Sequence, residues 1–140
     1  MKHLTAFLAL LEAARKSHHT AHWITKGPNF YGDHLLFERL YTAIDGEIDA
    51  IGERLTQRGG EEAVDPVHTT ELTMNYLEHW AKTQDIYERA QIVERTIQAG
   101  IVSVRKEMTP MSPGLDNLLV SIADAHETPL YLLGQRVKGN

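Results

Sequence analysis

The fold of this chain follows from HHTAHW at residues 18–23 and, beyond a Gly-Pro break, DHLLFERLYTAIDGEIDAIGER at residues 33–54. Both segments carry polar side chains at helical spacing. His34 and Glu38 are four residues apart and share one helix face, and His22 lies near the end of the preceding segment. Imidazole and carboxylate groups in this pattern predict a metal site that suits iron or zinc.

Two acids farther along the second segment cannot reach the first pair within one chain. Asp49 and Glu53 are again four residues apart, and Asp49 lies eleven residues beyond Glu38 on nearly the same side of the helix. Eleven residues span about 16 Å of helix, whereas metal–ligand bonds measure about 2 Å. The two pairs therefore belong either to separate sites with other helices or to sites shared by antiparallel copies of this helix. In the second case a two-fold dimer holds two identical sites.

These residues resemble the ferroxidase pattern of Dps proteins, the miniferritins of bacteria. The similarity is strong through Gly60, and beyond it only the number and length of the helices correspond. Glu38 departs from the pattern, because the family usually has Asp at that place. The matching features are His22-Trp23, His34, Asp49, Glu53-Arg54, G-x-x-F from Gly27 to Phe30, and Gly59-Gly60.

The resemblance implies an enzyme, a ferroxidase that oxidises Fe(II) and stores the ferric product in a hollow shell. Hydrogen peroxide is the implied oxidant, with dioxygen as the other choice, and the shell is a homo-oligomer of twelve subunits built from two-fold dimers. Dinuclear iron is the implied metal, with zinc as a substitute. The implied ligands, which are also the catalytic residues, are His22, His34, Glu38, Asp49 and Glu53.

Further side chains have possible roles near this site. The resemblance makes Trp23 an electron donor beside the iron and makes Asp116 a candidate for lining a pore through which iron passes. His18, one turn before His22, is left open between an additional metal contact and an exposed side chain. Asp45 is either an outer partner of the site or, in the simpler interpretation, a solvated acid. The role of His19 is left open, and the histidines that lack a partner at useful spacing are interpreted as surface or hydrogen-bonded residues: His3, His68, His79 and His126.

Apolar periodicity predicts an all-α fold, a ferritin-like four-helix bundle with a short extra helix in the crossover between the second and third long helices. The chain is expected to form one domain over residues 1–140. Pro129 is expected to kink or end the last helix, with a bend before Tyr131. The predicted helices cover residues 4–26, 31 or 33 to 58, 69–79 and 82–108, and the last begins at Gly114 or Leu115.

The charge and hydrophobic composition of the chain restrict the partners that the protein is expected to bind. A net charge of −5 argues against an extended DNA-binding surface, and only Met1 and Lys2 precede His3 where many Dps proteins carry a basic tail. We therefore expect weak or absent DNA binding. No apolar run approaches the roughly 20 residues that span a bilayer, and the chain has no cysteine. A soluble, cytoplasmic protein without a membrane partner is expected.

Three other functions compete with the ferroxidase. A single-chain diiron site of the larger ferritins or oxygenases needs Glu-x-x-His on two helices, and this sequence contains no Glu-x-x-His. A non-catalytic helical shell that binds zinc or other cations stays open, as does a DNA-compacting assembly.

Overall fold

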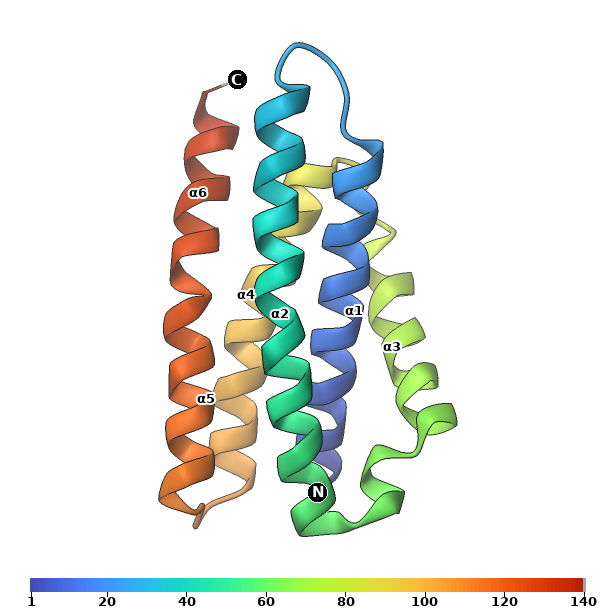
Figure 1. Cartoon of the computed structure of the whole chain (residues 1–140), viewed down its shortest axis with the longest axis vertical. Coiled ribbons are helices and arrows are strands. Elements are labelled where there is room, and N and C mark those ends of the chain that lie inside the picture. The colour runs from blue at the N-terminus through green and yellow to red at the C-terminus, as the bar shows by residue number, and fades with distance from the viewer. Residues whose placement is uncertain (140) are drawn as a thin grey trace.

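The computed structural model describes residues 1–139, and those residues form helices and connecting turns without a strand. Four long rods lie side by side, as Figure 1 shows, and a shorter helix covers one side of the bundle. The expected all-α architecture is confirmed, with a short extra helix in the crossover between the second and third long helices. The elements are α1 (Lys2–Ile24), α2 (Phe30–Gly59), the 3-10 helix η1 (Glu61–Val64), α3 (Pro66–Trp80), α4 (Ile86–Glu107), α5 (Pro113–Ala125) and α6 (Glu127–Lys138).

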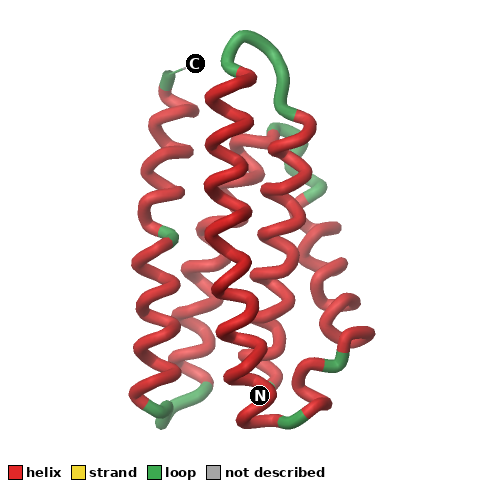
Figure 2. The backbone as a smooth tube through the Cα atoms, viewed as in Figure 1, coloured by secondary structure: helices red, strands yellow, loops and turns green. Residues whose placement is uncertain are grey.

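The fourth rod of the bundle consists of two helices, α5 and α6, which meet end to end in Figure 2. The helix breaks at His126, three residues before Pro129, so the predicted interruption of the last helix before Tyr131 is confirmed. Pro129 falls in the first turn of α6, where the backbone N–H groups have no partner inside the helix, so the proline ring is tolerated there.

Side-chain caps set helix starts that apolar periodicity placed elsewhere. Asp65 accepts a hydrogen bond from the backbone N–H of His68 at 2.9 Å, and α3 therefore begins at Pro66 rather than at residue 69. Asp85 accepts from Tyr87 and Glu88, so α4 begins at Ile86 rather than at residue 82. A capping acid decides these boundaries because it satisfies N–H groups that the helix cannot.

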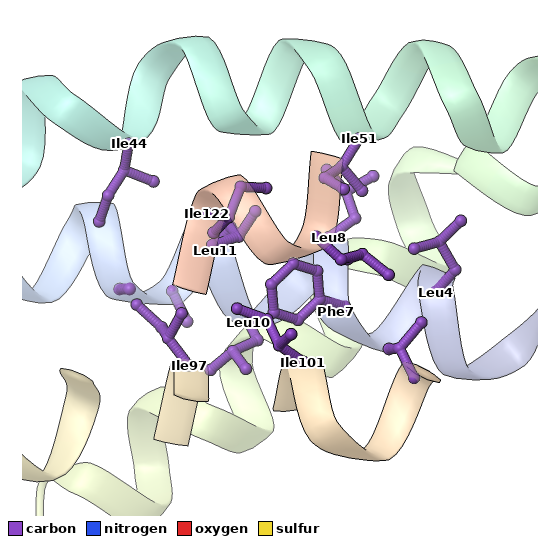
Figure 3. Close-up of a cluster of buried hydrophobic side chains, with 14 of the residues drawn as sticks. Leu4, Phe7, Leu8, Leu10, Leu11, Ile44, Ile51, Ile97, Ile101 and Ile122 are labelled. Atoms are coloured by element: carbon purple, nitrogen blue, oxygen red, sulfur yellow. The ribbon is translucent and has the colours of Figure 1, made fainter. Parts of the chain in front are cut away.

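The larger of two clusters of buried apolar side chains joins α1 to α2, α4 and α5, and the smaller cluster lies toward the end of the bundle where α1 passes into α2. Phe7 and Leu10 of α1 point toward Ile97 and Ile101 of α4 in Figure 3. Each fully buried side chain of this size contributes about 1.5–3 kcal/mol. This packing fixes α1 and α2, which carry the predicted metal ligands.

A glycine allows α4 to approach α1 closely. A Cβ atom on Gly100 would lie 2.9 Å from Cδ2 of Leu10 and 3.1 Å from Cδ1 of Phe7. The missing side chain therefore explains why a helix-weakening residue interrupts the apolar stripe of α4.

Candidate metal centre

Two of the predicted ligands meet where α1 ends and α2 begins. His22 lies in the last turn of α1 and is buried, whereas His34, near the start of α2, is half-buried. Their imidazole rings stack with centroids 3.6 Å apart. Residues on two different helices thus form one paired group.

Each of these histidines is held by the backbone of the other. Nδ1 of His22 lies 2.7 Å from the carbonyl oxygen of His34, and Nδ1 of His34 lies 2.7 Å from the carbonyl oxygen of His22. A carbonyl oxygen only accepts, so both Nδ1 atoms carry a proton and donate it. In the neutral ring Nε2 then keeps its lone pair, the usual arrangement of a metal-bound histidine.

Aromatic rings surround the histidine pair. Phe30 stacks on His34 with centroids 5.0 Å apart. The ring of His19 lies 4.1 Å from that of Trp23 and 4.2 Å from that of Tyr41. Trp23 is 62% exposed. The predicted electron donor therefore lies at the surface beside the pair, in contact with His19.

The three predicted carboxylate ligands are exposed. Glu38 is one turn beyond His34 on α2. Asp49 and Glu53 line an open groove of about 650 Å³ between α1, α2 and α3. Glu12 of α1 lines the same groove, and burial raises the pKa of its carboxyl group against the opposing hydrogen bond with Thr73.

The five predicted ligands do not converge within one subunit. Asp49 lies three helical turns from Glu38, about 16 Å along α2. Among residues 1–139, no three side chains of the His, Cys, Asp or Glu type are arranged as a metal site. The predicted ligands thus fall into two separate groups: His22 of α1 lies with His34 and Glu38 near the start of α2, and Asp49 and Glu53 lie farther along α2.

A second group of ionisable side chains lies inside the bundle and was not anticipated. We call His18, Glu47, Glu94 and His126 the core ion cluster. Glu94 accepts from His126 Nδ1 at 2.7 Å and contacts His18 Nε2 at 3.1 Å, while His126 Nε2 donates to Glu47 at 2.7 Å. The members come from α1, α2, α4 and the break between α5 and α6, so the cluster joins all four rods.

Mutual hydrogen bonds stabilise the charges of this cluster. Burial alone raises the pKa of Glu94, but hydrogen bonds from His126 and His18 outweigh burial and lower the pKa to about 2. Burial lowers the pKa of His126, yet its bonds to Glu47 and Glu94 raise the pKa to about 10. His126 is therefore an imidazolium between two carboxylates at neutral pH.

The core ion cluster decides the environment of His18 and bears on the possibility of a metal site within one subunit. His18 is 1% exposed, so the exposed alternative is wrong, and its bonded nitrogen faces Glu94. Ionisable groups from all four rods do meet in the bundle, as in a single-chain metal site. Both nitrogens of His126, however, are engaged with carboxylates. A metal would have to displace these hydrogen bonds.

The sequence carried one signal for this cluster. Glu94 falls on the apolar stripe of α4, four residues after Ala90 and three before Ile97, and a carboxylate at such a position must find a buried partner. His126 had no comparable signal, because its partners are distant in the chain.

Two other predicted residues have ion-pair partners of their own. Asp45 forms an ion pair with Arg15, and the side chains are 55% and 35% exposed, respectively. Asp116 accepts a hydrogen bond from Nε of Arg105 at 2.7 Å, also at the surface. Asp45 fits the simpler interpretation of a solvated acid. The pore role of Asp116 stays a prediction.

Comparison with known proteins bears on the family and the fold of the chain. The family model described as Ferritin-like domain matches residues 1–127. A protein named "DNA protection during starvation protein" from Brevibacillus brevis is 48% identical over 42 residues, 30% of this chain and 28% of that protein. "DNA protection during starvation protein 2" from Bacillus anthracis is 30% identical over 92 residues, 64% of this chain and 60% of that protein. The resemblance to Dps proteins is confirmed.

These matches span less than two thirds of the curated relatives. The crystal structure of Dps from Thermosynechococcus elongatus superimposes with a TM-score of 0.76 and 19% identity, covering 97% of this chain and 90% of that one, and this similarity concerns the fold. Within residues 1–139, no helix has the length and apolar character to cross a membrane.

Proposed function

Because the chain belongs to the ferritin-like family, we propose that it is an iron-oxidising and iron-storing miniferritin. Fe(II) is its substrate and a ferric mineral, kept inside a homo-oligomeric shell, is its product. The shell is a dodecamer of two-fold dimers, the oxidant is hydrogen peroxide, and the process protects the cell against oxidative damage. The Dps relatives and the fold support this function.

The observation that carries the proposal is the interlocked pair of His22 and His34. The Nδ1–H of each ring donates a hydrogen bond to the backbone carbonyl oxygen of the other histidine, which leaves Nε2 able to bind a metal. Histidines with only a packing role have no need of this arrangement. Imidazole and carboxylate ligands together suit iron, since carboxylates tolerate the rise in charge from Fe(II) to Fe(III).

A shared site explains why one subunit holds two half-sites. An antiparallel two-fold dimer about the middle of α2 brings His22, His34 and Glu38 of one subunit to Asp49 and Glu53 of the other. Exposed apolar side chains beside the histidines support burial by a second subunit, because such a group is costly in water. These side chains are Trp23, Ile24, Phe30, Tyr31 and Leu35.

The chemistry assigned to the site is a balanced two-electron step. Two Fe(II) ions give one electron each to one hydrogen peroxide, whose O–O bond breaks, and two protons complete two water molecules. Pairing the irons prevents the one-electron reaction that releases hydroxyl radical. When only one iron is bound, Trp23 supplies the second electron.

Anaerobic loading with Fe(II) followed by peroxide tests the proposal. The wild-type protein should consume about one peroxide for two Fe(II) and retain the ferric product in the large particle on gel filtration. His34→Ala should lose most of this activity, and His79→Ala, which alters an exposed histidine of α3, should keep it. A wild-type protein that binds Fe(II) or zinc without turnover would instead be the non-catalytic cation-binding shell.

A further inference from the structure

The hydroxyl group of Tyr87 lies between the two ends of the loop that joins α1 to α2. It is 3.0 Å from Oγ1 of Thr25, the residue that follows α1, and it donates a hydrogen bond to Asp33 in the first turn of α2. Thr25 comes three residues after His22, and Asp33 directly precedes His34. One side chain of α4 therefore ties together the segments that carry the two metal-binding histidines.

A second side chain holds the same aspartate from the opposite end of the sequence. Arg136, in the last turn of α6, donates from Nε to Oδ1 of Asp33 at 2.7 Å and from a terminal nitrogen to Oδ2 at 2.9 Å. The guanidinium also lies over the Tyr87 ring, 4.4 Å from its centroid. Such a two-point contact fixes the direction of the carboxylate as well as its position.

Stability alone is a poor reason for this arrangement. Asp33 is 3% exposed, so its charge has been taken out of water. A buried ion pair contributes little net stability, because desolvation offsets most of the attraction, and apolar side chains would serve as well. The hydrogen bonds of this network have defined directions, however, and they restrain the distance between the end of α1 and the start of α2.

We infer that Tyr87 and Arg136 are positioning residues of the half-site formed by His22 and His34. They set the gap between the end of α1 and the start of α2 at which each Nδ1–H reaches the other histidine's carbonyl oxygen. This inference rests on the proposed metal-binding function of the two histidines. It assigns to α4 and α6, which supply no predicted ligand, a part in holding the metal.

The reason for the requirement is the short reach of a hydrogen bond. Both reciprocal bonds measure 2.7 Å, and an outward shift of either helix end by about half an ångström lengthens both together. The backbone hydrogen bonds of the connecting loop do not join the two helices, because Thr25 bonds back to Ala21 of α1, whereas Phe30 and Asp33 bond to Gly27 and Asn29 at the start of α2. The restraint comes from Thr25, Tyr87, Asp33 and Arg136.

Cobalt binding to the assembled protein tests the inference. Tyr87→Phe removes the hydroxyl but keeps the ring, and the matched control Tyr76→Phe makes the same change on α3, where the ring packs near Trp80. The Co(II) component that His34→Ala abolishes defines the site. Its affinity should fall about tenfold or more in Tyr87→Phe, the size of effect seen for outer partners of metal ligands, and stay at the wild-type value in Tyr76→Phe.

The visible spectrum of bound Co(II) separates positioning from a general loss of stability. It reports ligand geometry, so Tyr87→Phe should change it while metal-free thermal unfolding stays close to wild type. Thr25→Val and Arg136→Gln, which cut the network at its other links, should weaken Co(II) binding in the same direction. Wild-type affinity and spectrum in Tyr87→Phe and Arg136→Gln would overturn the inference alone. A wild-type protein that binds Co(II) no better than His34→Ala would overturn the proposed function, and the inference with it.

Discussion

Nδ1 of His126 donates a hydrogen bond to Oε1 of Glu94 across 2.7 Å inside the bundle. The two residues are 32 positions apart in the sequence, and the bond anchors the break between α5 and α6 to the middle of α4. The core therefore contains charged side chains whose pKa values differ between the folded and unfolded states, and the free energy of unfolding depends on pH for this reason.

His126→Gln should lower the free energy of unfolding by about 3–5 kcal/mol at pH 6, because it leaves the buried Glu94 without its cationic partner. Urea unfolding followed by circular dichroism, at one protein concentration, measures the change. His79→Gln, at an exposed position, is the matched control and should leave the free energy unchanged within about 0.5 kcal/mol.

The pH dependence of this difference has a definite sign. The pKa of His126 is raised from 6.5 to about 10, so its contribution is complete below 6.5 and disappears as the pH rises through 10. The pKa of Glu94 is lowered from 4.5 to about 2, so its contribution disappears as the pH falls through 2. The difference in unfolding free energy between wild type and His126→Gln should therefore be largest between about pH 4.5 and 6.5, and it should become smaller toward pH 10. A constant gap from pH 6 to 10 would contradict a charged His126.

Gly46 and Gly52 of α2 should reveal the dimer contact. A Cβ atom on either would meet nothing within 4 Å in the subunit, so alanine should stabilise an isolated helix by about 1 kcal/mol. If a second α2 packs there, alanine should instead obstruct the dimer, and sedimentation velocity should show smaller particles than the large oligomer expected of wild type.

Gly134→Ala provides the control for that experiment. Gly134 lies on α6, where an added Cβ also meets nothing within 4 Å, and its substitution should keep the particle intact and raise stability. Gly46→Ala and Gly52→Ala particles that match wild type in size and in iron oxidation would count against close packing of α2 on its partner.

How much the sequence predicted depended on how local each interaction is. The spacing of His34 and Glu38 on one helix was readable, and so were the apolar stripes that gave the bundle. The bonds between His22 and His34 join residues twelve positions apart across a loop, and periodicity contains no information on ring orientation. Helix starts shifted because Asp65 and Asp85 cap them, a local signal that the apolar pattern outweighed.

The core ion cluster was missed for a different reason. Glu47 and His126 are 79 residues apart, and no spacing rule relates residues on separate rods of a bundle. Only the isolated acid on the apolar stripe of α4, Glu94, indicated that a buried partner existed. The break at His126 was readable in the sequence, because Pro129 cannot donate the backbone hydrogen bond that a continuous helix needs.

DNA binding should be weak at physiological salt. The chain has 14 Lys and Arg against 19 Asp and Glu, and affinity for the phosphate backbone comes from clustered cations. A gel shift with double-stranded DNA should show no complex at about 10 μM protein, within the usual range of non-specific binding. A complex that persists at this salt, with a chelator present to remove bridging metal, would show that the acidic composition misleads.

Mixed assembly of His34→Ala and Glu53→Ala tests the shared site most directly. Each variant removes one ligand from every site and should fold but oxidise Fe(II) poorly. In a mixed two-fold dimer one site combines both lesions. The other takes its intact His34 from the Glu53→Ala subunit and its intact Glu53 from the His34→Ala subunit, so it has the wild-type ligands.

The size of the recovery follows from random pairing. Half of the dimers are then mixed, and each has one intact site of two, so activity should return to roughly a quarter of wild type. A site built within one subunit predicts no recovery, because every subunit in the mixture carries a lesion. Co-expressed particles that contain both chains by mass spectrometry, yet stay as inactive as either parent, would therefore refute the two-fold ferroxidase. Reconstituting each variant separately and then mixing the finished shells at once is the control, because such a mixture contains no mixed dimer at the start and should be inactive.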